Sequence, residues 1–372
     1  MIITNPPRER TFGHNIVQPD WPNLTLPYLA NYFEKPEVID NSQSLNYPKM
    51  KGDIAISIRS EREYPKGLEM IKLFGIKIAG GPSAMAHKEE LYSMGVHVNR
   101  IEEDKLDDTP IPRWDLAPKL KSKYFKGRNT GSIEMSRGCP HSCDFCATTA
   151  YWKEFKHKSN DRILEELKYL KEIDRTHIYL TDDNFGVNIP KHTALLEKLV
   201  DLDMRFFTQI RADTIAKNPE MIKLAKRAGF YGFLIGFDTY DSDVMSGENK
   251  KTSIETNIKA SQICRENDIA IYGCHIYGLP SQKNPKDFEK TFEMGRKYSD
   301  LFVMSFFHAL PGTKSADKAP VRGEEWQKEY GNYYGRHQFS LREAVLTLTH
   351  KNPIVRNFKR GGYKKYFSYK LR

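Results

Sequence analysis

The chain lacks the two features that would take it to or through a membrane. No uninterrupted apolar stretch approaches the roughly eighteen residues needed to span a bilayer. The segment from Met1 to Pro7 has neither the basic start nor the long apolar core of a signal peptide. The 372 residues are 39% hydrophobic and 28% charged, which indicates a globular protein rather than a disordered one. These absences predict a protein of the cytoplasm with no membrane span.

Cysteine is also scarce, with five residues in the whole chain. An odd count with three cysteines close together argues against a disulfide framework. The other two, Cys264 and Cys274, fall in a helical and a strand pattern, and we expect them to be buried small hydrophobic residues.

The clustered cysteines follow the spacing Cys-x3-Cys-x2-Cys between Ser136 and Cys146. These offsets would share one face of a helix, but Gly138 and Pro140 inside the run favour a loop that wraps around a ligand. Zinc with His141 as a fourth ligand is an alternative, although His141 lies within the first spacer, where its reach is poor. A cubane iron-sulfur cluster has four irons, so three thiolates leave one iron open to a small molecule.

With Phe145 just before the last cysteine, this motif resembles the radical S-adenosylmethionine (SAM) superfamily. The resemblance implies a 4Fe-4S cluster ligated by Cys139, Cys143 and Cys146, with SAM on the fourth iron. It also implies reductive cleavage of SAM to a 5'-deoxyadenosyl radical that abstracts hydrogen from an unactivated carbon. An electron donor such as flavodoxin or ferredoxin is then an expected partner. Two remaining thiols cannot fully ligate a second cluster, which weighs against classes that need an auxiliary one.

Residues 1–118 show a compressed strand and helix alternation that predicts an α/β fold with a Rossmann-like parallel sheet. Strands are expected at Met1–Thr4, Glu37–Asp40, Asp53–Ile58, Ile76–Ala79 and Val96–Ile101. Helices are expected at Leu24–Phe33, Tyr64–Phe74 and Lys88–Met94. Ligands of open parallel sheets bind at the carboxyl ends of the strands.

This region resembles the cobalamin-binding domain that precedes the barrel in one large branch of the superfamily. The likeness is carried by Asn5-Pro6-Pro7, by the bridging segment 108–115 and by Gly80 with Gly81, which the resemblance places next to the cobalamin tail. The Asp-x-His-x-x-Gly motif of many cobalamin proteins is absent, and His14 lies in the corresponding loop without that context. The helix after the second strand is reduced to about residues 42–50. A degenerate domain that has lost cobalamin is therefore a rival interpretation.

From Gly131 to Thr313 the alternation becomes regular and predicts a partial (β/α)6 barrel over residues 119–315. Strands are expected at Ser132–Met135, His177–Thr181, Arg205–Ile210, Gly232–Gly236, Ile269–Tyr277 and Leu301–Phe307. Helices are expected at Ser159–Ile173, Ile189–Leu202, Pro219–Ala228, Ser253–Asn267 and Pro285–Tyr298. In such barrels the chemistry lies at the carboxyl ends of the strands.

Polar residues follow the second barrel strand at this edge. Asp182, Asp183 and Asn184 are suitable acceptors for the SAM ammonium, and the family resemblance assigns the same segment to that role. A helix N-cap by Asp183 or Asn184 is the structural alternative.

The later strands supply the remaining candidates of the expected SAM site. Gln209 and Arg211 end the third strand, and Arg211 is suited to bind the SAM carboxylate, while Asp213 either bonds ribose or restrains Arg211. Asp238 ends the fourth strand where relatives commonly carry glutamate. Ile276 and Gly278 of the fifth strand are expected to contact adenine. The nearby His275 is more often a core residue in such a place than a ligand.

The pattern of residues 316–372 predicts a short helical extension with a basic, aromatic tail. Ser340 and Glu343 form a capping box. Much of the net charge of +10 is concentrated in the tail, which suits either a solvated segment or a nucleic-acid contact.

Three functions remain open from the sequence. The first is cobalamin-dependent methylation of an unactivated carbon by radical SAM chemistry. The second is a radical cyclisation, rearrangement or oxidation without cobalamin. The third is a nucleic-acid-binding protein with a structural cluster. The substrate, whether a small molecule, a peptide or a nucleic acid, is not specified by the sequence.

Overall fold

The computed structural model describes residues 1–6, 24–41, 47, 49–58, 63–99, 103–122, 125, 127–152, 154–310 and 312–318. Pro7, His14, most of the reduced helix at 42–50 and the extension beyond residue 318 lie outside this set. By contacts the chain divides into two compact units, Met1–Ile133 with Lys156–Tyr179, and Glu134–Phe155 with Leu180–Arg372. In the part of the chain that the structure describes, no helix is both long and apolar enough to cross a bilayer.

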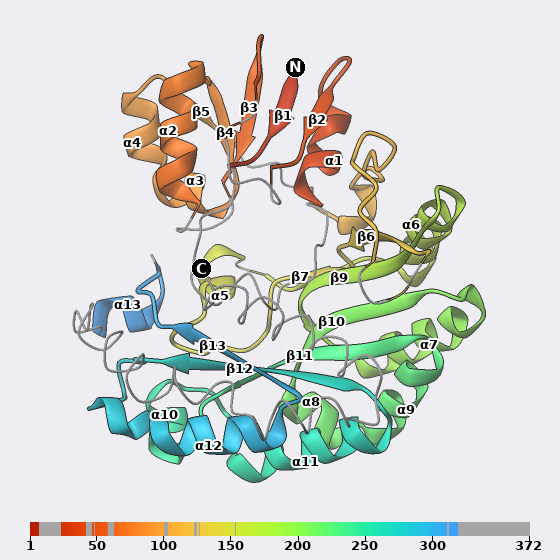
Figure 1. Ribbon diagram of the computed structural model, residues 1–372, viewed down its shortest axis with the longest axis vertical. Helices are drawn as coiled ribbons and strands as arrows, with labels where there is room; N and C mark the ends of the chain where they lie inside the picture. Colours follow the sequence, from red (N-terminus) through yellow and green to blue (C-terminus); the bar gives the residue numbers. More distant parts are fainter. Residues whose placement is uncertain are drawn as a thin grey trace, which may run out of the picture. The chain divides into compact units, whose positions relative to one another are not determined.

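The first unit contains a five-stranded parallel sheet (Figure 1). Its strands, in the spatial order β2-β1-β3-β4-β5, are β2 (Glu37–Ile39), β1 (Ile2–Thr4), β3 (Ile54–Ser57), β4 (Ile78–Gly80) and β5 (His97–Val98). The connecting helices are α1 (Thr25–Leu29), η2 (Ala30–Tyr32), α2 (Tyr64–Phe74), α3 (Pro82–Ala86) and α4 (Lys88–Ser93). All five predicted strands are therefore confirmed within a few residues.

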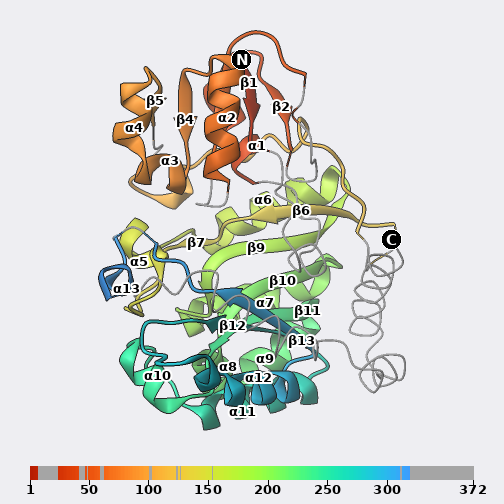
Figure 2. The ribbon, with the colours of Figure 1, turned by 60° about the vertical axis from the view of Figure 1, so that its left-hand side comes forward.

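Side-chain alternation on β1 explains why helices cover both faces of this sheet. Ile2 joins the core cluster that includes Met70 and Ile71 of α2, and Figure 2 shows α2 lying against the sheet. The next residue, Ile3, packs into a separate cluster with Leu26 of α1. A parallel sheet buried on both faces is the Rossmann-like arrangement that the sequence predicts.

The same unit contains η3 (Leu106–Asp108), β8 (Lys156–His157), α6 (Asn160–Glu172), β6 (Asn129–Ile133) and the first half of β9 (Arg175–Phe185). Arg175 is fully enclosed and donates hydrogen bonds to four backbone carbonyls, those of Trp114, Ala117, Pro118 and Thr130. Its guanidinium also lies 5.1 Å from the centre of the Trp114 ring. The buried guanidinium of Arg175 thus has hydrogen-bond acceptors without a carboxylate partner, and it holds the backbone of residues 114–118 against β6.

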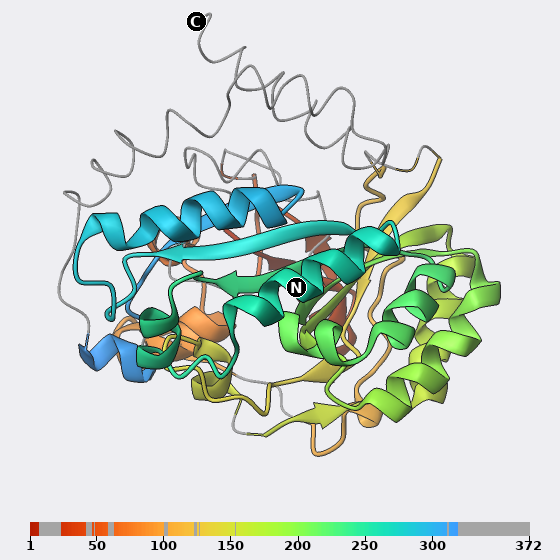
Figure 3. The same cartoon turned by 90° about the horizontal axis from the view of Figure 1, so that it is seen from below.

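A second sheet of six strands has the order β13-β12-β11-β10-β9-β6. The strands that follow β9 are β10 (Arg205–Arg211), β11 (Phe230–Asp238), β12 (Ala270–Tyr277) and β13 (Leu301–Phe306), and they pair in parallel. Helices α7 (Ile189–Leu199), α8 (Ala212–Lys217), α9 (Pro219–Arg227), α11 (Ile254–Glu266) and α12 (Glu289–Tyr298) line one side of the curved sheet (Figures 1 and 3). This is the predicted partial barrel.

Several boundaries and short elements differ from the predictions. Strand β9 continues to Phe185 instead of ending at Thr181, so Asp182 to Asn184 belong to the strand. The cap of α7 is Asn188, whose side chain accepts a hydrogen bond from Lys191 N at 3.1 Å, and the alternative that Asp183 or Asn184 caps a helix is therefore wrong. The short helices α5 (Ala147–Tyr151), α8, α10 (Ser242–Gly247) and α13 (Lys314–Lys318) were not predicted, whereas η5 (Pro285–Phe288) is the first part of the helix predicted at Pro285–Tyr298.

Candidate functional site

The three clustered cysteines lie in an irregular loop between β7 (Ser136–Arg137) and α5, and all three are half-buried. This confirms the loop and excludes the shared helix face. Gly138 enters the loop at φ +85°, where a Cβ atom would lie 2.4 Å from the carbonyl oxygen of Glu154. Glycine is therefore required at this position by both backbone conformation and space.

Strand β9 holds the start of the cysteine loop. Asp183 accepts hydrogen bonds from Gly138 N at 2.9 Å and from Thr148 Oγ1 at 3.1 Å, which bridges the two ends of the loop. Asn184 Nδ2 lies 3.8 Å from the Sγ atom of Cys139, within the reach of a weak hydrogen bond to sulfur. Both residues contact the loop directly, so β9 positions it.

Asp182 requires a correction, because it does not face an open mouth as the sequence suggests. Its side chain is fully buried and accepts hydrogen bonds from both the backbone N–H and the hydroxyl of Ser136. Burial raises its pKa to about 7. Its enclosed carboxylate thus bonds the residue that leads into the cysteine loop and does not face an open side of the sheet.

Arg211 lies at the carboxyl end of β10, beside the second cysteine. Its Nε bonds Asp213 at 2.8 Å, its Nη1 lies 3.7 Å from Cys143 Sγ, and its Nη2 bonds the carbonyl oxygen of Lys250 at 3.2 Å. Asp213 therefore restrains Arg211, as one of the two expected roles for it proposes. Gln209, two residues earlier on the same strand, is half-buried.

Asp238 ends β11 with a left-handed backbone, at φ +59°. Its carboxylate forms a buried ion pair with Lys250, whose Nζ also donates to the carbonyl oxygen of Gly236 at 2.9 Å. Lys250 Nζ lies 6.0 Å from the centre of the Phe145 ring in the cysteine loop. Sequence reasoning missed Lys250, because a lysine in a run of polar residues carries no signal of burial.

At the end of β12, Ile276 is half-buried, as an adenine contact would require. The N–H of Gly278 was expected to serve as a donor for a ligand, but it already donates to Gln282 Oε1 at 2.5 Å. The chain itself thus uses this donor, and a contact of Gly278 with adenine would have to involve its other atoms. His275 is fully buried, burial lowers its pKa to about 4, and its ring stacks on Phe302 at 4.5 Å, so it is a core residue.

Electrostatics at the loop work in two directions. Burial raises the pKa of both Cys139 and Cys143, while the positive charges of Arg211 and Lys250 act on Cys143 in the opposite sense. Two buried cations beside a thiol favour the thiolate that a metal centre needs. Among the described residues, no three His, Cys, Asp or Glu side chains converge on a single ion position. A cubane needs no such convergence, because each thiolate binds a different iron.

In the first unit, Gly81 follows β4 at φ +95°, and a Cβ atom there would lie 2.5 Å from the carbonyl oxygen of Ile58. A Cβ atom on Gly80 would lie 3.0 Å from the carbonyl oxygen of Asn99. Contacts within the sheet thus already account for both glycines. The strand end leads through Gly81 directly into α3.

The chain matches the profile of the radical SAM superfamily over residues 133–295. It is 28% identical to the hopanoid C-3 methylase of Methylococcus capsulatus over 320 residues, which cover 80% of this chain and 60% of that protein. It is 22% identical to an anaerobic magnesium-protoporphyrin IX monomethyl ester cyclase of Synechocystis over 291 residues, covering 73% of this chain and 56% of that one. The chain therefore spans little more than half the length of these relatives.

Among solved structures, the fold is similar to that of the radical SAM methyltransferase TsrM from Kitasatospora setae. The TM-score is 0.63 at 16% identity, over 84% of this chain and 74% of TsrM. The similarity covers a parallel-sheet unit as well as the half-barrel. By their cysteine motif and the profile match, residues 133–295 belong to the radical SAM superfamily, and the fold of the chain, with its N-terminal Rossmann-like sheet, is similar to that of TsrM.

Proposed function

We propose that the protein is a radical SAM enzyme that methylates an unactivated carbon with the help of cobalamin. When bound, the 4Fe-4S cluster and SAM supply a 5'-deoxyadenosyl radical, and methylcobalamin supplies the methyl group. The observation that carries the proposal is the cysteine loop itself, held at the carboxyl ends of β9 and β10 by Asp183, Asn184 and Arg211. Active sites of β/α barrels lie at this edge.

The residues of the second unit then take distinct roles. Cys139, Cys143 and Cys146 ligate the cluster. Arg211, fixed by Asp213, presents a rigid guanidinium beside the cluster to the SAM carboxylate. Further contacts to SAM are proposed for Asp183, Asn184, Gln209, Asp238, Ile276 and Gly278. For Asp238, the ion pair with Lys250 means that a ribose hydroxyl would share the carboxylate with this lysine.

The assignment of methylation rests on relatives. The M. capsulatus relative is named as a methylase, and TsrM is a methyltransferase solved with cobalamin and a 4Fe-4S cluster bound. Gly80 and Gly81, at the carboxyl edge of the five-stranded sheet, are the proposed neighbours of cobalamin. In this proposal residues 1–118 form the cobalamin domain, residues 119–315 the barrel and residues 316–372 the extension, and a flavodoxin or ferredoxin supplies the electron.

The relative named as a cyclase supports a second candidate, in which the same radical leads to ring formation without transfer of a methyl group. The two candidates share the cluster and SAM. They differ in whether a second SAM is consumed as a methyl donor.

Anaerobic reconstitution followed by mass spectrometry of SAM products tests both candidates. With cobalamin added, methylation predicts S-adenosylhomocysteine together with 5'-deoxyadenosine, whereas the second candidate predicts 5'-deoxyadenosine alone. A protein that binds zinc, or that contains no inorganic sulfide, would contradict both. Salt-sensitive RNA or DNA binding without SAM cleavage would support the nucleic-acid alternative.

A further inference from the structure

Glu248 is a buried carboxylate at the carboxyl end of α10, one residue beyond that helix, and only 2% of its surface is exposed. Its Oε1 accepts hydrogen bonds from Ser281 N at 2.9 Å and Ser281 Oγ at 2.8 Å. Its Oε2 accepts a hydrogen bond from Ser315 Oγ at 2.7 Å. One side chain thus joins the loop after β12 to α13, the helix that follows β13.

The backbone around Glu248 joins the same point to the cysteine loop. The carbonyl oxygen of Glu248 accepts from the N–H of Asp144 at 3.0 Å, and Asp144 O accepts from Ser315 N, also at 3.0 Å. The next residue, Asn249, donates from Nδ2 to Ser142 O at 2.8 Å. Ser142 and Asp144 flank Cys143, so both neighbours of the central cysteine are bonded to residues 248–249.

Further contacts lie at the same place. Lys318 of α13 bonds the Asp144 carboxylate at 2.8 Å. The turn before α13 approaches α5, because a Cβ atom on Gly312 would lie 3.3 Å from Ala150 Cβ. Figures 1 and 2 both show α13 beside α5, the helix that follows the last cysteine. Three segments that are distant in sequence therefore meet at Glu248, two of them at its carboxylate and the cysteine loop at its backbone carbonyl oxygen.

We propose that Glu248 is a positioning residue that keeps the cysteine loop in register with the loops after β12 and β13. Part of this inference rests on the proposed function, because it takes the cysteines as cluster ligands and the end of β12 as the adenine side of the SAM site. Ser281 is three residues beyond Gly278. Loss of the Glu248 carboxylate then disturbs both the cluster and the binding of SAM.

The first test needs no cluster. Amide hydrogen exchange of the metal-free, full-length chain is compared for wild type, Glu248→Ala and Glu248→Gln, with the exposed Glu197→Ala of α7 as the matched control. Glu248→Ala is expected to speed exchange in peptides containing Ser281 by tenfold or more, since the Ser281 N–H loses its acceptor. The Asp144 N–H keeps its acceptor, the backbone carbonyl oxygen of residue 248, so its exchange is expected to rise by a smaller factor, because Ser315, which bonds Asp144 O, is no longer held by the carboxylate. Glu248→Gln keeps an oxygen for Ser281 and is expected to stay within about threefold of wild type. Wild-type exchange in Glu248→Ala would overturn the proposal.

The second test uses the reconstituted protein and Ser281→Ala, which loses the Oγ hydrogen bond to Glu248 without leaving Ser281 N–H unpaired. We expect iron content and melting temperature close to wild type, with the KM for SAM raised about two- to tenfold and kcat changed less. A lower melting temperature with an unchanged KM would show that Glu248 only stabilises the fold. If the wild-type chain binds no iron, the proposed function fails, whereas the exchange experiment still decides the role of Glu248.

Discussion

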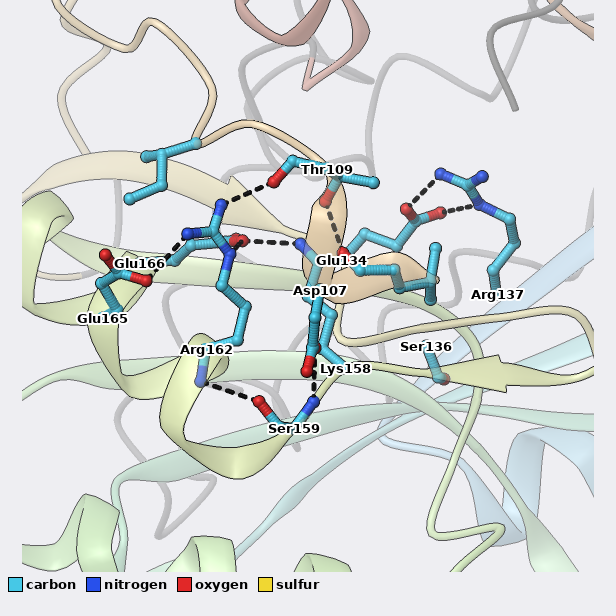
Figure 4. Close-up of polar contacts among 12 residues, drawn as sticks. Asp107, Thr109, Glu134, Ser136, Arg137, Lys158, Ser159, Arg162, Glu165 and Glu166 are labelled. Atoms are coloured by element: carbon cyan, nitrogen blue, oxygen red, sulfur yellow. Dashed lines mark hydrogen bonds and ion pairs between the residues drawn. The ribbon is translucent and has the colours of Figure 1, made fainter. Parts of the chain in front are cut away.

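The two units place their buried charges in opposite ways. In the first unit, buried charged side chains pair with one another or bond backbone carbonyl oxygens of the same unit. Lys158 and Arg162 both pair with the buried carboxylate of Glu166, at 2.7 and 3.2 Å, and Arg162 also reaches the carbonyl oxygen of Thr109 (Figure 4). With Arg175, these contacts tie α6 and β9 to residues 107–118.

In the second unit, polar side chains instead bond or approach the irregular cysteine loop. Asp183 bonds Gly138 N, and Asn184 and Arg211 approach cysteine sulfurs. The Glu248 carboxylate bonds Ser281 and Ser315, and the backbone carbonyl of Glu248 bonds Asp144 of the cysteine loop. A network whose members bond only one another contributes chiefly to the stability of the fold. A network that bonds a reactive loop also determines the position of that loop. Substitutions in the two units should therefore damage different properties.

Replacing one clustered cysteine should have the largest effect. In Cys143→Ser we expect iron content to fall severalfold and SAM cleavage to drop below detection, because a cubane needs all three thiolates to leave only one iron open. The matched control is Cys264→Ala, which removes a fully buried thiol in α11 at a cost of roughly 1 kcal/mol in stability. Iron and sulfide analysis with quantified 5'-deoxyadenosine checks both variants. Full activity of Cys143→Ser would refute the assigned site.

Breaking the network in the first unit should affect stability rather than chemistry. Glu166→Ala leaves Lys158 buried without its carboxylate, which typically costs about 3–5 kcal/mol. Urea unfolding read by limited proteolysis of residues 1–133 measures this loss, with iron content measured in parallel at low urea. The double variant Lys158→Met with Glu166→Leu removes both charges and should cost clearly less. Equal losses in the single and double variants would mean that charge burial is not the cause.

The main helices and strands of both units could be predicted from the sequence, because hydrophobic periodicity, turn residues and helix caps are local properties. Sequence reasoning also identified the cysteine motif, Arg211 with Asp213, and the general edge of the sheet. It missed Lys250, Glu248 and Gln282, because burial of a polar side chain depends on which loops meet in space. It misjudged Asp182 for a related reason: extending β9 by four residues decides which of two adjacent carboxylates is enclosed.

Substitutions at Asp183 should have an intermediate effect, and they separate its role in holding the cysteine loop from its proposed role in binding the SAM ammonium. In Asp183→Ala, the half-buried Gly138 N–H and Thr148 hydroxyl lose their acceptor, at about 1–3 kcal/mol. We therefore expect the reconstituted cluster to be lost more readily during gel filtration. Asp183→Asn keeps an acceptor for Gly138 and should retain iron. If Asp183 also binds the SAM ammonium, Asp183→Asn should raise the KM for SAM while iron content stays constant, and an unchanged KM would limit Asp183 to holding the loop.

The last expected effect is a change in the pH dependence of stability at Asp182. Because burial raises its pKa from 3.8 to about 7, the folded state holds this proton more tightly than the unfolded chain does. Its contribution to stability is complete below about pH 4 and is lost as the pH rises through about 7, with a slope of at most about 1.4 kcal/mol per pH unit. Asp182→Asn cannot titrate, so the free energy of unfolding should fall less steeply across this range than in wild type. The exposed Asp201→Asn is the matched control. A slope in Asp182→Asn parallel to that of wild type would show that Asp182 is ionised in the folded protein.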